Sequence, residues 1–400
     1  MMQSKKNLFL TYLCLVGMLL AFVVGCNEDK NTSNSPPTTP GKIDGLPGDP
    51  GPGNLAGKVV GTINKQPLEG ITILVNSRTT TTASDGTFLL EGVGEGNLGV
   101  VASDDSVYTR TQAVNTSAGR SVLLDVLEKN SNFNLKFYRE IARGYHPLER
   151  DIFPTHRWTN PTPPTFYINT NGQAANDGVI DQKDIDTVAR VLREIVPAFT
   201  ANFYSSIRIE TAFFPSNATI GELPDHSFII SFDDSLIQLG AYGVTYTQPD
   251  FISPTTSAIR KVLIFLLDDD RYYEASTPGR ISFEEIIAHE SGHGLGFRHT
   301  SEASFGGLPS VMVKTGKYGG MYSEHDLLHM GIVYQRPAGN TDIDNDPLPG
   351  AGSKLANPKP FVFLDQRANF PITAEQHRTL NRLEGFHIVK ELVAEHQIFY

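Results

Sequence analysis

Cysteine is almost absent from this 400-residue sequence, which has only Cys14 and Cys26. With so few thiols, the body of the chain has no disulfide framework and no cysteine-based zinc cluster, so histidines and carboxylates must hold any metal. Positive charge is also scarce, because 33 Lys and Arg stand against 44 Asp and Glu, a formal net charge of -11. Such an acidic chain has no basic surface for a phosphate backbone, and we expect no nucleic-acid partner.

A long hydrophobic run occurs only at the N-terminus. Residues 1–25 begin with a lysine pair and continue as a mostly apolar stretch, the pattern of an export signal. The stretch ends in Gly25 and Cys26, which resembles the lipobox of bacterial lipoproteins. The resemblance implies a signal peptide over 1–25, a lipid on Cys26, and an exported, membrane-anchored protein in the periplasm or at the cell surface. An uncleaved N-terminal anchor is the alternative.

Two segments of different composition follow. Residues 26–54 consist mostly of Asn, Thr, Ser, Pro and Gly, which predicts a disordered tether. Residues 55–128 carry short runs of alternating apolar and polar residues separated by turn dipeptides, which predict a small all-β sandwich. The pattern of strands and turns from Gly57 to Gly92 resembles the carboxypeptidase-regulatory-like domain. That resemblance implies an accessory module without catalytic residues.

Residues 133–336 mix helix and strand patterns and predict one α+β domain. Apolar residues at helical spacing predict a helix over 182–196 that ends at Pro197. Apolar runs predict strands at 165–169, 207–214, 227–232 and 261–267. Residues 337–400 predict a linker followed by a helical tail at about 373–395. The expected fold is therefore multidomain, a small all-β sandwich followed by an α+β domain.

The most informative stretch is His289-Glu290-Ser-Gly-His293-Gly-Leu-Gly296-Phe-Arg-His299. On a helix, residues four apart lie on one face, so His289 and His293 can direct their imidazoles at one ion. Glu290 then has the position of a general base for a water molecule beside that ion. Gly296 can adopt a positive φ, which ends the helix and brings His299 back as a third ligand. Three protein ligands leave one coordination position open, as in catalytic zinc sites.

The eleven-residue motif resembles that of the metzincin zinc endopeptidases, and its residue sequence is most similar to that of the matrixin branch. The resemblance implies a peptidase domain with a twisted mixed sheet, an active-site helix and a methionine turn beneath the metal. It also implies zinc ligands at His289, His293 and His299, with Glu290 as the catalytic residue. Met312, within Ser310-Val-Met312, is the candidate for the methionine turn, with Met321 and Met330 as competitors.

Three further groups of residues have an expected place in this scheme. Leu239 to Thr245 is a candidate edge strand along which an extended substrate adds itself as another strand, or an ordinary edge strand. Asp268, Asp269 and Asp270 resemble the calcium-binding turn of matrixins, although a solvated loop has the same composition. A pair four apart, His325 and His329, is expected to lie on a helix surface.

The sequence therefore predicts a secreted, lipid-anchored zinc endopeptidase, a hydrolase of protein or peptide bonds that uses metal-activated water and Glu290 as general base. Zn²⁺ is the expected cofactor and Ca²⁺ a candidate one. The partners are a protein or peptide substrate and a membrane reached through the N-terminal lipid; nothing indicates an oligomeric state. One alternative is a surface adhesion or binding protein with an inactive metalloprotease-like domain. Another is a zinc hydrolase of non-peptide bonds.

Overall fold

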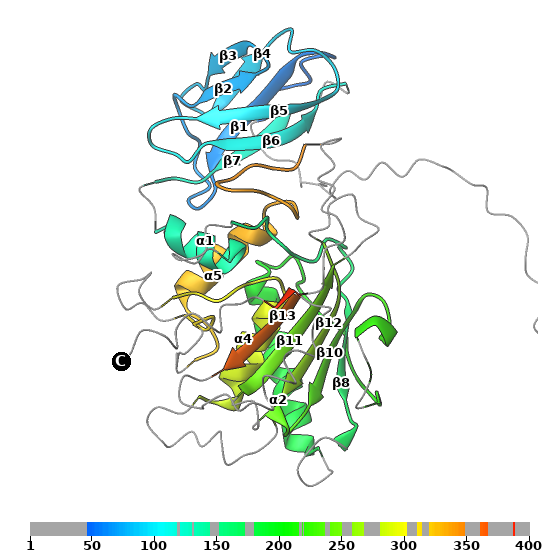
Figure 1. Ribbon diagram of the computed structural model, residues 1–400. Helices are drawn as coiled ribbons and strands as arrows, with labels where there is room; N and C mark the ends of the chain where they lie inside the picture. The colour runs from blue at the N-terminus through cyan, green and yellow to red at the C-terminus, as the bar shows by residue number, and fades with distance from the viewer. Residues whose placement is uncertain are drawn as a thin grey trace, which may run out of the picture. The chain divides into compact units, whose positions relative to one another are not determined.

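The computed structural model describes residues 46–117, 121–129, 132–144, 152–172, 180–215, 218, 220–236, 241–249, 258–267, 281–301, 310–313, 320–348, 361–366 and 387–388. Within these residues the protein is rich in strands, which form three sheets, and it also carries helices (Figure 1). The predicted signal peptide, Cys26 and most of the predicted tether lie outside the described residues. No helix in the described part is long and apolar enough to cross a membrane.

The N-terminal module is a β-sandwich, as predicted. Its core consists of inward-facing aliphatic side chains such as Leu55, Val59 and Ile73, all with 0% exposure. One sheet has the order β4 (Thr87–Leu90), β1 (Leu55–Gly61), β7 (Val122–Val126), and the other β3 (Arg78–Thr81), β2 (Thr72–Val75), β5 (Asn97–Ser103), β6 (Arg110–Asn115). The sequence did not predict β3 or β6, because both are mainly polar and lack a continuous apolar alternation.

The second module is built on one mixed sheet of seven strands. Its order is β14 (His387–Ile388), β13 (Phe361–Gln366), β11 (Ala241–Pro249), β12 (Ile259–Leu266), β10 (Ser227–Phe232), β8 (Thr165–Asn169), β9 (Ile209–Ala212). β12, β10, β8 and β9 are mutually parallel, whereas β11 runs antiparallel to β12. The predicted combination of a small β module with a mixed module of helices and strands is confirmed.

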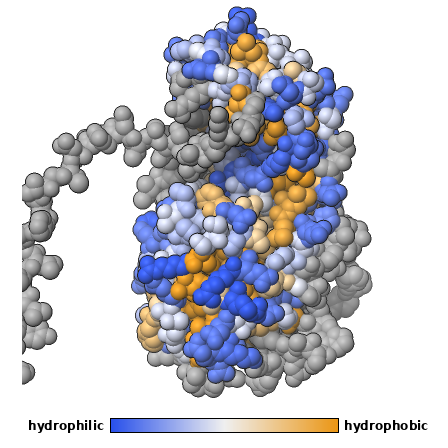
Figure 2. Space-filling model, turned by 180° about the vertical axis from the view of Figure 1, so that it is seen from behind, coloured by the Kyte–Doolittle hydropathy of each residue, from blue (hydrophilic) through white to orange (hydrophobic). Residues whose placement is uncertain are grey.

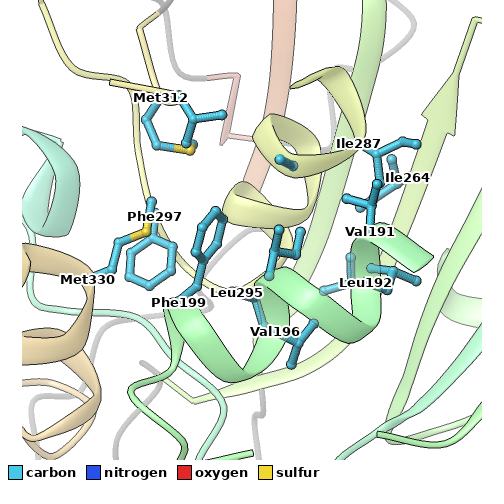
Figure 3. Packing of buried hydrophobic residues seen from close by; sticks show 14 of the residues in the cluster. Val191, Leu192, Val196, Phe199, Ile264, Ile287, Leu295, Phe297, Met312 and Met330 are labelled. Atoms are coloured by element: carbon cyan, nitrogen blue, oxygen red, sulfur yellow. The ribbon is translucent and has the colours of Figure 1, made fainter. Parts of the chain in front are cut away.

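Two helices cover one face of this sheet. α2 (Gln182–Phe199) and α4 (Phe283–Gly294) share one apolar cluster with β10 and β12. Figure 3 shows Val191 of α2 close to Ile264 of β12 and Ile287 of α4. A smaller cluster on the opposite face includes Ile229 of β10 and Leu263 of β12, packed with the short helix η2 (Ile220–Glu222).

The prediction that Pro197 ends α2 is wrong, because the helix continues to Phe199. A proline in the last turn of a helix removes one backbone donor and crowds the preceding turn, so other contacts have to offset this cost. Phe199 is fully buried, and its ring meets that of Phe297 edge to face with centroids 6.2 Å apart. This tertiary packing holds the last turn.

The prediction that 239–245 forms an edge strand is also wrong. β11 pairs with β12 on one side and antiparallel with β13 on the other. The tail contributes β13 and then β14, so the predicted helix at about 373–395 is wrong at His387–Ile388, its only described part. The apolar run Phe361-Val-Phe-Leu favours a strand, and the free edge of β11 supplies its partner.

The segment 337–348 is packed against the protein and is not the linker that the sequence predicted. Arg336 is fully buried and its guanidinium bonds Asp344 at 2.8 Å and Asp125 of β7 at 2.5 Å. Arg110 of β6 also contacts Asp344, with Nη1 and Oδ1 2.6 Å apart. These charged groups tie the sandwich to the segment that follows α5 (Glu324–Tyr334).

The face shown in Figure 2 is largely hydrophilic, with hydrophobic residues in smaller patches between charged and polar ones. Large hydrophobic side chains that are exposed in the described part are Leu89, Phe213 and Leu348. They lie on different segments of the chain.

Candidate metal centre

The centre is built on α4, which begins directly after Ser282. Ser282 is the N-cap, and its hydroxyl accepts a hydrogen bond from the backbone N–H of Glu285 at 3.1 Å. Ile286 and Ile287 are fully buried in the shared cluster with α2. Packing on this side fixes the rotation of α4, so that the next turn presents His289 and His293 together.

Three imidazoles converge, as the motif predicted. Nε2 of His293 lies 3.1 Å from Nε2 of His289 and 3.1 Å from Nε2 of His299, and the remaining pair is 3.3 Å apart. His299 returns to the helix because Gly296 adopts φ 107° just beyond the end of α4. A Cβ at Gly296 would lie 2.1 Å from the carbonyl oxygen of His156, so only glycine fits.

The protonation pattern of these rings fits a cation. Nδ1 of His289 lies 2.6 Å from the carbonyl oxygen of Val311, and Nδ1 of His293 lies 2.8 Å from that of Phe297. A carbonyl only accepts, so each Nδ1 carries the proton and each Nε2 presents a lone pair. Lone pairs that converge at this range can bind a positive ion between them.

The separations also fit the size of a metal site. Tetrahedral zinc with zinc–nitrogen bonds of about 2.0–2.1 Å places its nitrogen ligands about 3.3–3.4 Å apart. Burial, together with the neighbouring His299 and His289, holds the pKa of His293 well below its usual value. The ring is therefore neutral at physiological pH, which is the state that binds a metal. These three histidines can hold a metal ion.

The side chain of Glu290, a residue of α4, contacts β11. It is fully buried, and Thr245 of β11 places its hydroxyl oxygen 2.5 Å from the Glu290 carboxylate. Gly243 lies beside the same side chain, because a Cβ there would approach the Cγ of Glu290 to 2.4 Å. β11 thus holds the candidate base in place. The sequence did not single out Thr245 or Gly243 for this role, although it placed both on the strand.

The segment around Met312 supports the centre from a second side. Met312 is fully buried, and its sulfur would lie 2.5 Å from a Cβ at Gly292, between the two ligands of α4. Met312 and its competitor Met330 both belong to the apolar cluster (Figure 3), and the nearest atoms to a Cβ at Gly292 are those of Met312. Asp326 of α5 accepts hydrogen bonds from Ser310 Oγ at 2.6 Å and from the N–H of Val311 at 3.0 Å. The Val311 carbonyl accepts the hydrogen bond from Nδ1–H of His289. Asp326 holds Val311 and therefore orients that ligand indirectly.

A third support comes from α1 (Leu135–Arg143), which the sequence did not connect with the centre. The buried carboxylate of Glu140 accepts hydrogen bonds from the backbone N–H of Ser301 at 2.8 Å and from its hydroxyl at 3.0 Å. The N–H of Arg298 donates to the carbonyl of Ile141 at 2.8 Å. The two contacts flank His299, so α1 fixes the backbone that carries the third ligand.

Two sequence predictions on other residues have different outcomes. Asp268, Asp269 and Asp270 lie outside the described residues. The prediction that His329 lies on a helix surface is wrong, since the ring is fully buried. Its Nε2 accepts from the N–H of Asn134 at 3.0 Å, and its Nδ1 donates to the carbonyl of His325 at 2.7 Å.

No protein-family model and no curated protein matches the chain. Among solved structures, it is similar to a type II cohesin–X-dockerin complex from Acetivibrio cellulolyticus, a C-terminal interface mutant, at 20% identity and a TM-score of 0.15. The match covers 18% of this chain and 51% of that one, so this chain spans about half the length of the solved chain. A TM-score of this size supports no assignment of fold or function.

Proposed function

We propose that the protein is a zinc-dependent endopeptidase of the metzincin type, matrixin-like, in which His289, His293 and His299 hold the metal and Glu290 is the general base. The observation that carries the proposal is the convergence of three Nε2 atoms within 3.3 Å of one another, on the helix that also carries Glu290. The alternative, an adhesion protein, does not require a buried glutamate beside three converging histidines.

When bound, zinc supplies a Lewis acid that lowers the pKa of a water molecule to about 7 and polarises the scissile carbonyl. The protein's own residues do the rest. Glu290 takes a proton from the attacking water at its carboxylate and delivers it to the leaving amine. Thr245 fixes the carboxylate from β11, and the carbonyls of Val311 and Phe297 fix the two ring orientations on α4.

Further parts of the proposal concern the rest of the chain. The β-sandwich is an accessory module, and lipid attachment at Cys26 tethers an exported protein to a membrane. Met312 forms the methionine turn. A calcium ion at Asp268, Asp269 and Asp270 belongs to the same matrixin-like proposal.

The test is cleavage of unfolded casein by the metal-loaded protein and by Glu290→Gln. Loss of one general base lowers the rate by at least about a hundredfold, while zinc content stays at the wild-type value because all three ligands remain. Removal of zinc with a chelator abolishes cleavage and added zinc restores it. Cleavage by Glu290→Gln at the wild-type rate contradicts the mechanism, and a metal-loaded wild type that cleaves no peptide bond favours a binding protein or a hydrolase of other bonds.

A further inference from the structure

The strand nearest to the candidate base is also the strand that the C-terminal tail joins. β11 contacts Glu290 through Gly243 and Thr245. On its outer side β11 pairs antiparallel with β13, from Thr247 opposite Phe361 to Ala241 opposite Gln366. The tail therefore runs in an extended conformation along the strand that flanks the metal centre.

The register of this pairing has a bulge at the β11 residue that contacts the candidate base. Ala241 lies opposite Gln366 and Val244 opposite Leu364, with a bulge between the two positions. Two residues of β11, Tyr242 and Gly243, thus face a single residue of β13. Gly243 is the residue in contact with Glu290, so the point where β11 bulges against β13 is also the point where β11 meets the candidate base.

The tail strands are an addition at one end of the sheet and not part of its centre. In the sheet order, β14 and β13 are the terminal strands, and β11 is the next one inward. β14 pairs with β13 at two positions, from Phe361 opposite His387 to Val362 opposite Ile388. Removal of the pair leaves the contacts between β11, β12 and α4 in place and exposes the backbone donors and acceptors of β11. A free strand edge of this kind binds an extended peptide as a further strand.

We propose that the outer edge of β11 is a strand-accepting site whose occupant is the chain's own segment Phe361–Gln366, and that an extended peptide substrate has to displace this segment. The second half of this inference rests on the proposed endopeptidase function. The first half, occupancy of the edge by the tail, does not. If the tail fills the edge nine-tenths of the time, the apparent affinity for an extended substrate is lowered about tenfold.

The test compares two variants of the full, metal-loaded chain. The double variant Phe363→Pro and Leu364→Pro removes adjacent backbone donors, so it breaks pairing whichever of the two residues faces β11. The matched control Phe363→Ala and Leu364→Ala changes the same side chains and keeps both donors. Hydrogen exchange of the β11 amides, measured without substrate, rises at least about tenfold in the proline variant and much less in the control. Equal protection of β11 in the proline and wild-type proteins overturns the inference.

The kinetic arm tests displacement. For an extended peptide substrate, the proline variant shows a KM about tenfold lower with kcat unchanged, whereas for a substrate too short to pair along β11 both constants stay the same. An unchanged KM despite faster exchange of β11 overturns the competition.

A binding arm separates this inference from the endopeptidase proposal. A labelled peptide with the sequence Lys359–Ala368 is titrated into the proline variant that also carries Glu290→Gln. Saturable binding, weaker by at least about tenfold in the alanine control because its edge is filled, supports the strand-accepting site even if no variant cleaves a peptide. No binding to either protein overturns it.

Discussion

Thr245 places its hydroxyl oxygen 2.5 Å from Oε2 of Glu290 and 3.0 Å from the backbone oxygen of the same residue. Replacing it by Val keeps the shape of a buried β-branched side chain and removes the hydroxyl. A hydrogen bond to a charged group contributes about 1.5–3 kcal/mol, so we expect kcat to fall roughly tenfold to a hundredfold in Thr245→Val. Zinc content stays the same, because no ligand is changed. A kcat within about twofold of wild type would contradict the positioning role.

Glu140 is expected to control metal affinity without touching the metal. Glu140→Ala removes both hydrogen bonds to Ser301 and loosens the backbone that carries His299. Loss of such a supporting contact typically weakens metal binding about 10–100-fold. The measurement is the zinc dissociation constant by competition with a chelator, with Glu284→Gln, a partly exposed change on α4, as the control. Wild-type affinity in Glu140→Ala would show that α1 has no part in the centre.

His329 is expected to make the protein less stable in acid. Burial lowers the pKa of its ring to about 4, and the N–H of Asn134 already fills the Nε2 position that a second proton needs. The unfolded chain, with a pKa of about 6.5, binds more protons than the native state between these values. The free energy of unfolding therefore falls as the pH drops from about 6.5 to about 4, by a contribution on the order of 3 kcal/mol.

His329→Gln keeps an acceptor for Asn134 and does not titrate. The urea-unfolding free energy of this variant should depend less on pH in that window than in wild type, whereas His325→Gln should retain the wild-type slope. Identical slopes in all three proteins would rule out His329 as the source of the dependence.

Arg336 is expected to be the most sensitive residue between the two modules. The Arg336 guanidinium lowers the pKa of Asp344, so both groups are charged at neutral pH. Arg336→Ala leaves Asp344 and Asp125 without that guanidinium, and removing one partner of a buried ion pair costs about 3–5 kcal/mol. The measurement is chemical unfolding at pH 7. The control Arg208→Ala removes an exposed pair with Glu210 and should cost less than about 1 kcal/mol.

The buried carboxylates around Arg336 also predict how the stability of the fold decreases in acid. Because the folded-state pKa of Asp344 is depressed, its stabilising contribution is present above the unfolded value near 3.8 and is lost as the pH falls below it. In Arg336→Ala this loss between pH 4 and 2 should be smaller than in wild type, as measured by unfolding at stepped pH. An undiminished acid loss would assign it to other carboxylates.

Local patterns predicted the convergence of the three histidines but not the contacts that support them. The cap at Ser282, the spacing of His289 and His293, and the turn at Gly296 are encoded within a single stretch of sequence, and all three are present in the structure. The roles of Glu140 and Thr245 depend on contacts between residues 161 and 45 positions apart, which periodicity does not indicate.

The same distinction applies to the fold. Strands with a continuous apolar run, such as β8 and β10, were predicted to the residue. Polar β6 was missed, since its pairing with β5 depends on a neighbour and not on its own pattern. The sequence analysis did not predict β13, whose partner β11 lies far away in the sequence.

The coordination of zinc in the metal-loaded protein is the most direct test of the central claim. X-ray absorption at the zinc edge should show one ion per chain with three imidazole nitrogens at about 2.0–2.1 Å and a light oxygen or nitrogen scatterer completing the shell. His299→Ala should lower the imidazole count to two and release most of the zinc. The account would be contradicted if the wild-type chain retained no zinc after dialysis had removed the free metal. Zinc bound by fewer than three imidazoles would also contradict it.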